Sequence, residues 1–316
     1  MSDSDSPSST PPAPKAFVLG AGLGTRLRPL TNDLPKPLVP FVGRPLITWA
    51  FDHLLGIGVD RFVVNTHHIP GAYDDAFPTG SYRDCPIDFR FEPILLETAG
   101  GIANVRDLLD GNAPFVVYNG DILTDISLQP ALDHHRASDD MVTLVLRSTG
   151  ANRNVSFDAA TGQVTDMRET LGRGKPEHQF TGIYIVDPAF LAHLEPGKKE
   201  SVVPIFLKLI ETENTIGGVV SDDGYWLDLG ERESYLDAHA LVLGDKPFVH
   251  ETATVHPNAQ ILGASSIGPN CQIGEGAVVE ASVLWDRVSV TPGTTLSRCI
   301  VRSDREVTGQ HSAEDL

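Results

Sequence analysis

Apolar and polar positions alternate along the first 150 residues in a way that predicts a layered α/β fold. Short apolar runs predict buried strands, and segments in which apolar residues recur every three to four positions predict helices. In the segment 46–55, Ala50 and Leu54 lie one helical turn apart, and glycines follow. The predicted strands are 16–19, 61–66, 87–91, 115–118 and 141–147, and the predicted helices are 46–55, 100–110 and 128–137. This alternation is typical of a parallel α/β sheet.

The pattern changes after residue 150. Short apolar strands follow one another without an intervening helix, and a tight turn at 159–162 separates the first two. Neighbouring strands joined by so short a turn run antiparallel. The expected elements are strands at 155–158, 163–167 and 179–186 and helices at 188–194 and 202–212. We therefore predict a lobe with antiparallel strands, inserted on the sheet.

A six-residue period of aliphatic side chains begins at residue 249. The aliphatic positions are Val249, Val255, Ile261, Ile267, Ile273 and Val279, and after a slip of one residue Leu284, Val290 and Leu296. Hexapeptide repeats of this kind form a triangular β-helix in which each aliphatic residue points into the prism and three repeats complete one turn. Nine repeats predict about three coils.

These patterns divide the chain into two domains and two tails. We predict an α/β domain over 15–245 and a β-helix over 246–305. Residues 1–14 are rich in Ser, Pro and Asp and have almost no large apolar side chains, so a disordered tail is expected. The charged residues 306–316 are expected to form a second, frayed tail.

Composition narrows the classes of partner. The chain has 316 residues, 41% of them hydrophobic, and a formal net charge of −18, which argues against a nucleic-acid or anionic membrane surface. It lacks a long apolar run and a basic-then-apolar N-terminus, so we expect neither a membrane span nor a secretory signal, and a cytoplasmic location. The three cysteines have no C-x-x-C spacing, so neither a disulfide framework nor a zinc site is indicated.

Residues 15–51 depart from this acidic balance, with five Lys or Arg residues against one acid. The predicted strand 16–19 opens into a turn with three glycines, followed by three cations: Gly20, Gly22, Gly24, Arg26, Arg28 and Lys36. The G-x-G-x-G spacing fits neither the dinucleotide fingerprint nor the Walker A loop. A turn without a ligand is the alternative, but it would not explain the cations. Glycine backbone amides and cations together suit a polyphosphate.

Two aspartates follow apolar segments. Asp121 comes directly after the strand 115–118, at the carboxyl end of a sheet strand, where ligands bind in open α/β sheets. Asp228 lies in the segment 226–230, which ends at a glycine. A solvated turn is the alternative for Asp121. Carboxylates beside a polyphosphate are suited to Mg²⁺, which takes oxygen ligands from one or two carboxylates and from substrate phosphates.

Taken in order, GAGLGTRLRPLT, the lysine of PKP, NGD and WLDLG resemble the sugar-1-phosphate nucleotidyltransferases over residues 15–243. The resemblance implies a Rossmann-like domain with a mixed, mostly parallel sheet, which forms an NDP-sugar and pyrophosphate from an NTP and a sugar 1-phosphate with Mg²⁺. It implies that Arg26 and Lys36 are catalytic and that Asp121 and Asp228 bind the metal. The nucleotide-binding residues it implies are Leu19, Gly20, Ala21, Gly22, Gly24, Thr25, Glu97, Gly100, Gly101 and Asn119.

The sugar and the base are indicated by separate features. The resemblance implies that Glu169, Thr181 and Gly182 contact the sugar. The repeats, with SVLWD at 282–286, resemble the left-handed β-helix of mannose-1-phosphate guanylyltransferases, which is the first choice. The LET-x-GG segment resembles uridylyltransferases acting on N-acetylmuramate 1-phosphate, which is the alternative. A non-catalytic regulatory subunit shares the two-part architecture. The β-helix is a candidate surface for homo-oligomerisation.

Overall fold

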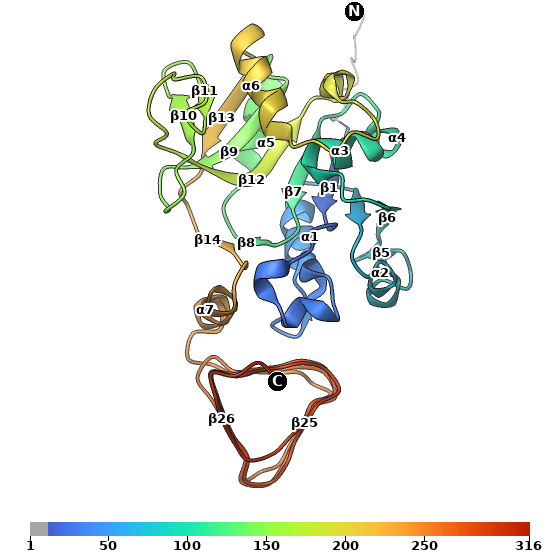
Figure 1. Ribbon diagram of the computed structural model, residues 1–316, viewed down its shortest axis with the longest axis vertical. Helices are drawn as coiled ribbons and strands as arrows, with labels where there is room; N and C mark the ends of the chain where they lie inside the picture. Colours follow the sequence, from blue (N-terminus) through green and yellow to red (C-terminus); the bar gives the residue numbers. More distant parts are fainter. Residues whose placement is uncertain (1–11) are drawn as a thin grey trace, which may run out of the picture.

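The computed structural model describes residues 12–316, in which an α/β domain sits on a triangular β-helix (Figure 1). The expected tail at 1–14 falls almost entirely outside these residues, and 12–14 belong to no helix or strand. No helix among the described residues is long and apolar enough to cross a bilayer.

One ten-stranded sheet forms the centre of the α/β domain. Its order is β10-β11-β13-β9-β12-β7-β1-β4-β6-β5. The bounds are β1 Lys15–Leu19, β4 Arg61–Thr66, β5 Ser81–Tyr82, β6 Cys85–Phe91, β7 Phe115–Asn119, β9 Val142–Arg147, β10 Val155–Asp158, β11 Gln163–Met167, β12 Gln179–Val186 and β13 Ile216–Val220. Strands β5, β11 and β12 run against the others, so the sheet is mixed and mostly parallel. This confirms the predicted fold class.

The antiparallel strands do not form a separate lobe, and in this respect the prediction is wrong. Strand β12 pairs antiparallel with both β7 and β9, so it lies inside the sheet. Strand β13 then pairs parallel with β9, and β11 and β10 continue the same sheet to its edge. The sequence shows where the strands are, but pairing across long distances in the chain places them.

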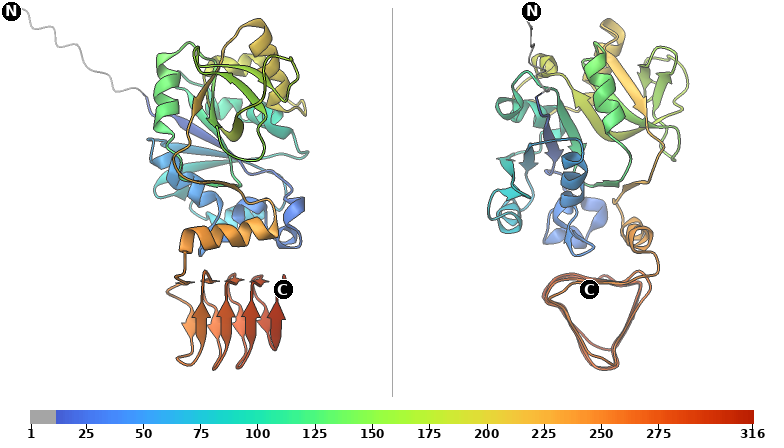
Figure 2. Two further views of the ribbon diagram at one scale, coloured as in Figure 1. Left: turned by 90° about the vertical axis from the view of Figure 1, so that its left-hand side faces the viewer. Right: turned by 180° about the vertical axis from the view of Figure 1, so that it is seen from behind.

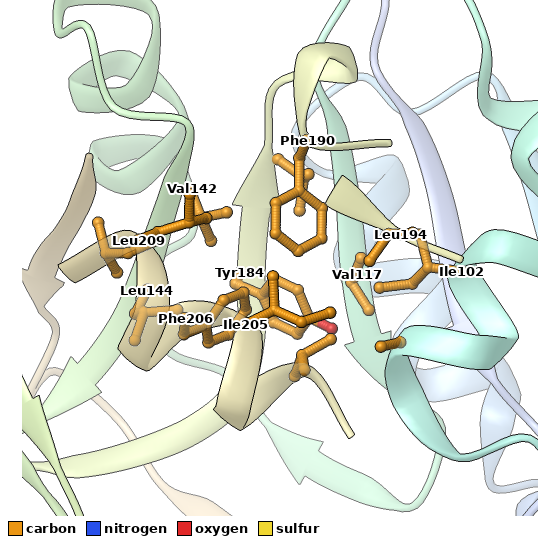
Figure 3. Packing of buried hydrophobic residues seen from close by; sticks show 14 of the residues in the cluster. Ile102, Val117, Val142, Leu144, Tyr184, Phe190, Leu194, Ile205, Phe206 and Leu209 are labelled. Atoms are coloured by element: carbon orange, nitrogen blue, oxygen red, sulfur yellow. The ribbon is translucent and has the colours of Figure 1, made fainter. Parts of the chain in front are cut away.

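Helices cover both faces of the sheet. Along β1, Phe17 packs into one core while Ala16 and Val18 pack into the other, as the two-residue period of a strand requires. Figure 3 shows the first core, where Phe206 packs near Leu144 and Tyr184. The helices are α1 Ile47–Leu55, α2 Gly71–Ala76, α3 Glu97–Asn104, α4 Arg106–Leu109, α5 Gln129–Ala137, α6 Val202–Thr212 and α7 Arg232–Leu243, with 3₁₀ turns η1 Thr25–Leu27, η2 Leu30–Asn32, η3 Lys36–Leu38 and η4 Pro188–His193.

Two small antiparallel strand pairs complete the α/β domain. Strands β2 (Pro40–Phe41) and β3 (Arg44–Pro45) pair antiparallel. Strands β8 (Ile122–Thr124) and β14 (Trp226–Asp228) pair antiparallel with Asp228 opposite Ile122. The second pair brings two segments far apart in the chain to the same place.

Three parallel four-stranded sheets form the sides of the β-helix. Its strands are β15 Phe248–Val249, β16 Thr254–Val255, β17 Gln260–Leu262, β18 Ser266–Ile267, β19 Gln272–Ile273, β20 Val278–Glu280, β21 Val283–Leu284, β22 Ser289–Val290, β23 Thr295–Ser297, β24 Ile300–Val301, β25 Glu306–Val307 and β26 Gln310–Ser312. They make four coils, stacked side by side beneath α7 in Figure 2.

The predicted tail at 306–316 is therefore wrong, and the β-helix has a fourth coil. After Leu296 the period shortens once more, to Val301, and then returns to six residues at Val307, and both side chains are buried. Strand β25 pairs with β22, and β26 pairs with β23. The charged residues of this segment hid the repeat because in a β-helix only the inward positions must be apolar.

A buried layer joins the β-helix to the α/β domain. Trp285 from the β-helix and Tyr235 from α7 are at most 1% exposed, and the Trp285 indole N–H donates to the Tyr235 hydroxyl at 3.2 Å. At the edge of this layer, Arg302 forms an ion pair with Asp33 at 2.9 Å. The aromatic contacts bury apolar surface from both parts, so the two parts pack as one body.

Candidate functional site

The glycine-rich loop leaves β1 and packs tightly against β4. The Gly20 N–H donates to the Asn65 side-chain oxygen at 2.8 Å, and a Cβ on Gly20 would lie 2.6 Å from the Asn65 carbonyl oxygen. Gly24 has a φ of +59°, in the left-handed region that favours glycine. After this turn, η1 begins at Thr25. Residues 21–25 of this turn line a cavity.

Lys36 is the buried cation of the site. It begins η3 between Pro35 and Pro37, and it is 5% exposed. Its ammonium donates to Asp121 at 2.8 Å and to Asp228 at 3.2 Å. A buried lysine needs compensating charge, and these two carboxylates supply it.

The antiparallel pairing of β8 with β14 brings Asp121 and Asp228 together. Asp121 directly precedes β8, and Asp228 ends β14, so both reach the same lysine. The Arg26 guanidinium also donates to Asp228, at 3.2 Å. Burial acts to raise the pKa of Asp228, but Lys36 and Arg26 together outweigh it and hold that pKa below its ordinary value. Two cations and two carboxylates form one charged cluster.

A cavity of about 520 Å³ opens beside this cluster. Residues of the glycine loop, the charged cluster and the start of α3 line the cavity together. The predicted site residues on its wall are Leu19, Ala21, Gly22, Gly24, Thr25, Arg26, Lys36, Glu97, Asn119 and Asp121. Seven residues without a predicted role also line it, namely Leu23, Pro37, Asn65, Leu95, Thr98, Ser201 and Gly230. Four of them lie within the motifs named from the sequence, whereas Asn65, Leu95 and Ser201 lie outside those motifs and reach the cavity through tertiary packing.

Three glycines that were predicted to bind the nucleotide pack against neighbouring segments behind the cavity wall. Gly20 lies against Asn65, as described above. A Cβ on Gly100 would lie 2.3 Å from the Lys198 carbonyl oxygen, and one on Gly101 would lie 3.1 Å from the Asn65 side-chain nitrogen. These positions therefore keep neighbouring segments close, and none of the three is among the residues that line the cavity.

Two segments that contribute to the cavity wall, the start of α3 and residues 198–201, are held together by backbone hydrogen bonds. The Ala99 N–H donates to the Glu200 carbonyl at 2.9 Å, and the Glu200 N–H donates to the Leu96 carbonyl at 3.0 Å. Glu97 begins α3 with a φ of +62°, a conformation that is strained for a residue with a side chain. Its carboxylate lies 3.8 Å from the Lys199 ammonium. Ser201, on the second segment, reaches the cavity wall.

Of the three residues predicted to contact the sugar, only Gly182 adjoins a residue that lines the cavity. The Thr181 side chain is 0% exposed, and its hydroxyl donates to the Val145 carbonyl at 2.8 Å, so it points into the sheet. Gly182 adjoins Asn119, because a Cβ there would lie 2.5 Å from the Asn119 side-chain nitrogen. Glu169 is exposed, with a φ of +55°, and it is not among the cavity-lining residues. The structure thus brings neither the Thr181 nor the Glu169 side chain into the cavity.

The carboxylate oxygens of the site are suited to a metal ion that also binds substrate phosphates. Within residues 12–316, no group of three or more His, Cys, Asp or Glu side chains could hold a metal ion alone. Asp121 and Asp228 nevertheless converge on one point, which Lys36 occupies. Two carboxylates plus phosphate oxygens and water are the usual environment of Mg²⁺.

Comparison with known proteins identifies the family. Residues 15–244 match the family model described as nucleotidyl transferase. The chain belongs to this family. Residues 243–314 of this nucleotidyltransferase match a second model, described as the GMPPB C-terminal domain.

Relatives of this nucleotidyltransferase differ in how much of it they cover. A mannose-1-phosphate guanylyltransferase of Mycobacterium tuberculosis is 32% identical over 301 residues, covering 90% of this chain and 83% of the relative. An N-acetylmuramate α-1-phosphate uridylyltransferase of Neisseria meningitidis is 32% identical over 231 residues, covering 72% of this chain and 97% of the relative. The crystal structure of HddC from Yersinia pseudotuberculosis complexed with GMP-PN has a TM-score of 0.58 at 23% identity, covering 71% of this chain and 97% of that chain, and shows a shared fold.

The family confirms the predicted enzyme class. The chain is a sugar-1-phosphate nucleotidyltransferase, with an NTP and a sugar phosphate as its class of substrates.

Proposed function

We propose that this nucleotidyltransferase makes GDP-mannose and pyrophosphate from GTP and mannose 1-phosphate. The observation that carries the proposal is the two-part architecture. The α/β domain and the β-helix both match family models, the second described as the GMPPB C-terminal domain, and the similarity to the mycobacterial guanylyltransferase extends over both. The similarity to the neisserial uridylyltransferase covers a smaller share of this chain.

In the proposed reaction, a phosphate oxygen of the sugar 1-phosphate attacks the α-phosphorus of the NTP. A new P–O bond forms there, and the bond from the α-phosphorus to the bridging oxygen breaks, so that pyrophosphate carries away the electron pair. The nucleophile is already ionised, so the site needs no general base. Its task is to bring two polyanions together and to stabilise charge on the leaving pyrophosphate.

The charged cluster suits that task. Arg26 and Lys36 are the cations on the cavity wall, and the glycine-loop amides are available to the triphosphate. We assign the stabilisation of the leaving pyrophosphate to Lys36, because it is buried and held between two prolines. A preorganised cation of this kind does not have to be reoriented during the reaction.

Mg²⁺ would be held by Asp121 and Asp228 together with phosphate oxygens. When bound, it would neutralise phosphate charge and orient the triphosphate. Both carboxylates are bound to Lys36 in the structure, so the ammonium and the metal compete for the same oxygens. Their partial exposure, 35% and 40%, leaves room for that exchange.

The nucleoside end of the NTP would lie against the start of α3, where Glu97 lines the cavity, and Asn119 would contact the nucleotide between the two ends. We place the sugar beside Gly182, which adjoins Asn119. Thr181 could contribute only its backbone there, because its side chain is turned into the sheet. Glu169 could take part only if the turn after β11 moved.

A uridylyltransferase acting on N-acetylmuramate 1-phosphate is the second candidate. The LET-x-GG segment and the 32% identity to the neisserial enzyme favour it. In this case the β-helix would have no direct role in substrate choice.

One experiment separates these candidates. Purified protein is given each of four NTPs with mannose, glucose, N-acetylglucosamine or N-acetylmuramate 1-phosphate in the presence of Mg²⁺, and pyrophosphate release is measured. The highest kcat/KM with GTP and mannose 1-phosphate would support the proposal, whereas a preference for UTP with N-acetylmuramate 1-phosphate would support the second candidate. No release in any combination would favour a regulatory subunit. The Asp121→Asn variant is the matched control for contaminating activity.

We also propose that the β-helix mediates homo-oligomerisation through its first coil. Val249 and Leu262 on that coil are each 40% exposed, and strands β15, β16 and β17 form one end of each sheet. Unpaired edge strands with apolar side chains favour pairing with another chain. Light scattering at micromolar concentration tests this: a monomer, or an oligomer unchanged by Leu262→Glu, would contradict it.

A further inference from the structure

A buried carboxylate behind the cavity has no role in the chemistry described above. Glu92 follows β6 and is 0% exposed. One of its side-chain oxygens accepts from the Asn65 side-chain nitrogen at 2.8 Å, and the other accepts from the Leu96 N–H at 3.0 Å. A charged group is costly to bury, so its place within a network that reaches the cavity calls for an explanation.

This network links two segments that line the cavity, the glycine loop and the start of α3. Asn65, which is 2% exposed and lines the cavity, accepts from the Gly20 N–H at the start of the glycine loop. Glu92 binds the N–H of Leu96, which directly precedes Glu97 and α3. A single series of buried hydrogen bonds therefore runs from the glycine loop through Asn65 and Glu92 to the start of α3.

The direction of these hydrogen bonds requires a carboxylate at position 92. Both ends of the chain, Gly20 and Leu96, are backbone N–H groups, which can only donate. The Asn65 amide accepts on one side and donates on the other, so the last member must accept on both sides. Ionised Glu does this. With Gln at this position, one donor would face another donor however the two amides were flipped.

We propose that Glu92 is a positioning residue that sets the glycine loop and the start of α3 in register for the NTP. This inference rests on the proposed function, because it concerns the nucleotide half of the same site. Glu92 does not contact substrate. It acts through Asn65 and through the backbone of Leu96, so its loss should weaken NTP binding while leaving chemistry and sugar-phosphate binding largely intact.

The hydrogen-bond directions provide a test by exchange. Glu92→Gln leaves two donors facing each other, and Asn65→Asp places two carboxylates side by side. The double variant N65D/E92Q restores a consistent chain. Its carboxylate at position 65 would accept from the Gly20 N–H and from the amide nitrogen at position 92, and the amide oxygen at position 92 would accept from the Leu96 N–H. The double variant also keeps one buried carboxylate, which moves from position 92 to position 65. Asp88→Asn is the control, because Asp88 lies on the same strand in a partly exposed ion pair with Arg61.

NTP binding is measured directly by calorimetry without the second substrate, alongside kcat, both KM values and thermal unfolding. If the binding-competent arrangement falls to about a tenth of the population in each single variant, the Kd for the NTP rises about tenfold. We expect that rise in both single variants, tighter binding in the double variant than in either, and a sugar-phosphate KM and kcat within about threefold of the parent. Asp88→Asn should bind as the parent does.

Two results would overturn the inference alone: parental NTP affinity in Glu92→Gln, or a loss in the double variant equal to the product of the two single losses. Absence of NTP binding in the parent would instead refute the proposed function, and this inference with it. If neither single variant folds, the double variant decides, since its folding and NTP binding support the exchange and its failure to fold counts against it.

Discussion

Replacing Lys36 by Met tests the centre of the proposed site. Methionine retains an unbranched apolar side chain of similar length and removes only the ammonium. The lysine side chain is 6% exposed, and its ammonium holds Asp121 and Asp228 at 2.8 and 3.2 Å. The fold should survive, because the carboxylates left behind are 35% and 40% exposed and can be hydrated.

The expected loss is in kcat. Removing one preorganised electrostatic contact to a developing negative charge costs about 10²–10³ in kcat, or about 2.7–4 kcal/mol of transition-state stabilisation. Binding of Mg²⁺ should be at least as tight as in the parent, because the ammonium no longer competes for the oxygens of Asp121 and Asp228. Lys36→Arg should not restore activity, since a planar guanidinium does not fit where a compact ammonium is enclosed between two prolines.

The assay is pyrophosphate release at saturating NTP and sugar 1-phosphate, with a Mg²⁺ titration and a thermal unfolding curve for each variant. Lys208→Met is the matched control, because Lys208 lies on the exposed face of α6. A kcat within threefold of the parent in Lys36→Met would refute the role assigned to Lys36. A variant that had lost its cooperative unfolding would instead show that the lysine is needed for the fold.

Three further predictions concern the surroundings of the site. Trp285→Ala should lower the free energy of unfolding, measured by urea titration, by about 3–5 kcal/mol, because it removes the buried indole from the layer that joins the β-helix to the α/β domain. An effect below about 1 kcal/mol would contradict that packing. Burial lowers the pKa of His239 from 6.5 to about 4, so the contribution of the neutral imidazole to stability is complete above pH 6.5 and is lost as the pH falls toward 4. Urea titrations should show a loss of about 2–3 kcal/mol in the free energy of unfolding between pH 7 and 4.5, and His239→Gln should reduce that loss. Gly182→Ala should raise the KM for the NTP and lower the melting temperature, because the residue has a φ of +78° and the new Cβ would displace Asn119. Kinetics and stability equal to those of the parent would contradict this prediction and would show that Asn119 can move freely.

Local patterns in the sequence were sufficient for most elements of the fold. The apolar run 61–66 coincides with β4, and the helical spacing over 46–55 coincides with α1 to within one residue. The hexapeptide period identified the β-helix because each inward position is read from spacing alone. It missed the fourth coil where the spacing changed to five residues before Val301 and the outward positions became charged.

The candidate site divides in the same way. The glycine loop, Lys36 and Asp121 could be identified from sequence because each lies at a strand end or in a dense local motif, whereas the sugar side has no such motif, and there the structure turns Thr181 into the sheet. Asn65 and Glu92 also lie at strand ends, but neither belongs to a recognised motif, so the sequence did not distinguish them from other polar residues.

What the sequence determined by itself is most of the strands and helices of the central sheet, three coils of the β-helix and the chemical character of the phosphate loop, because these depend on neighbours within a few residues. What only the tertiary structure decided is which distant segments meet. The antiparallel pairing of β8 with β14 brings Asp228 to Lys36 beside Asp121, and the buried hydrogen bonds through Glu92 connect Asn65 with the start of α3. Such contacts join residues far apart in the chain, and pairing and packing, rather than local spacing, select them.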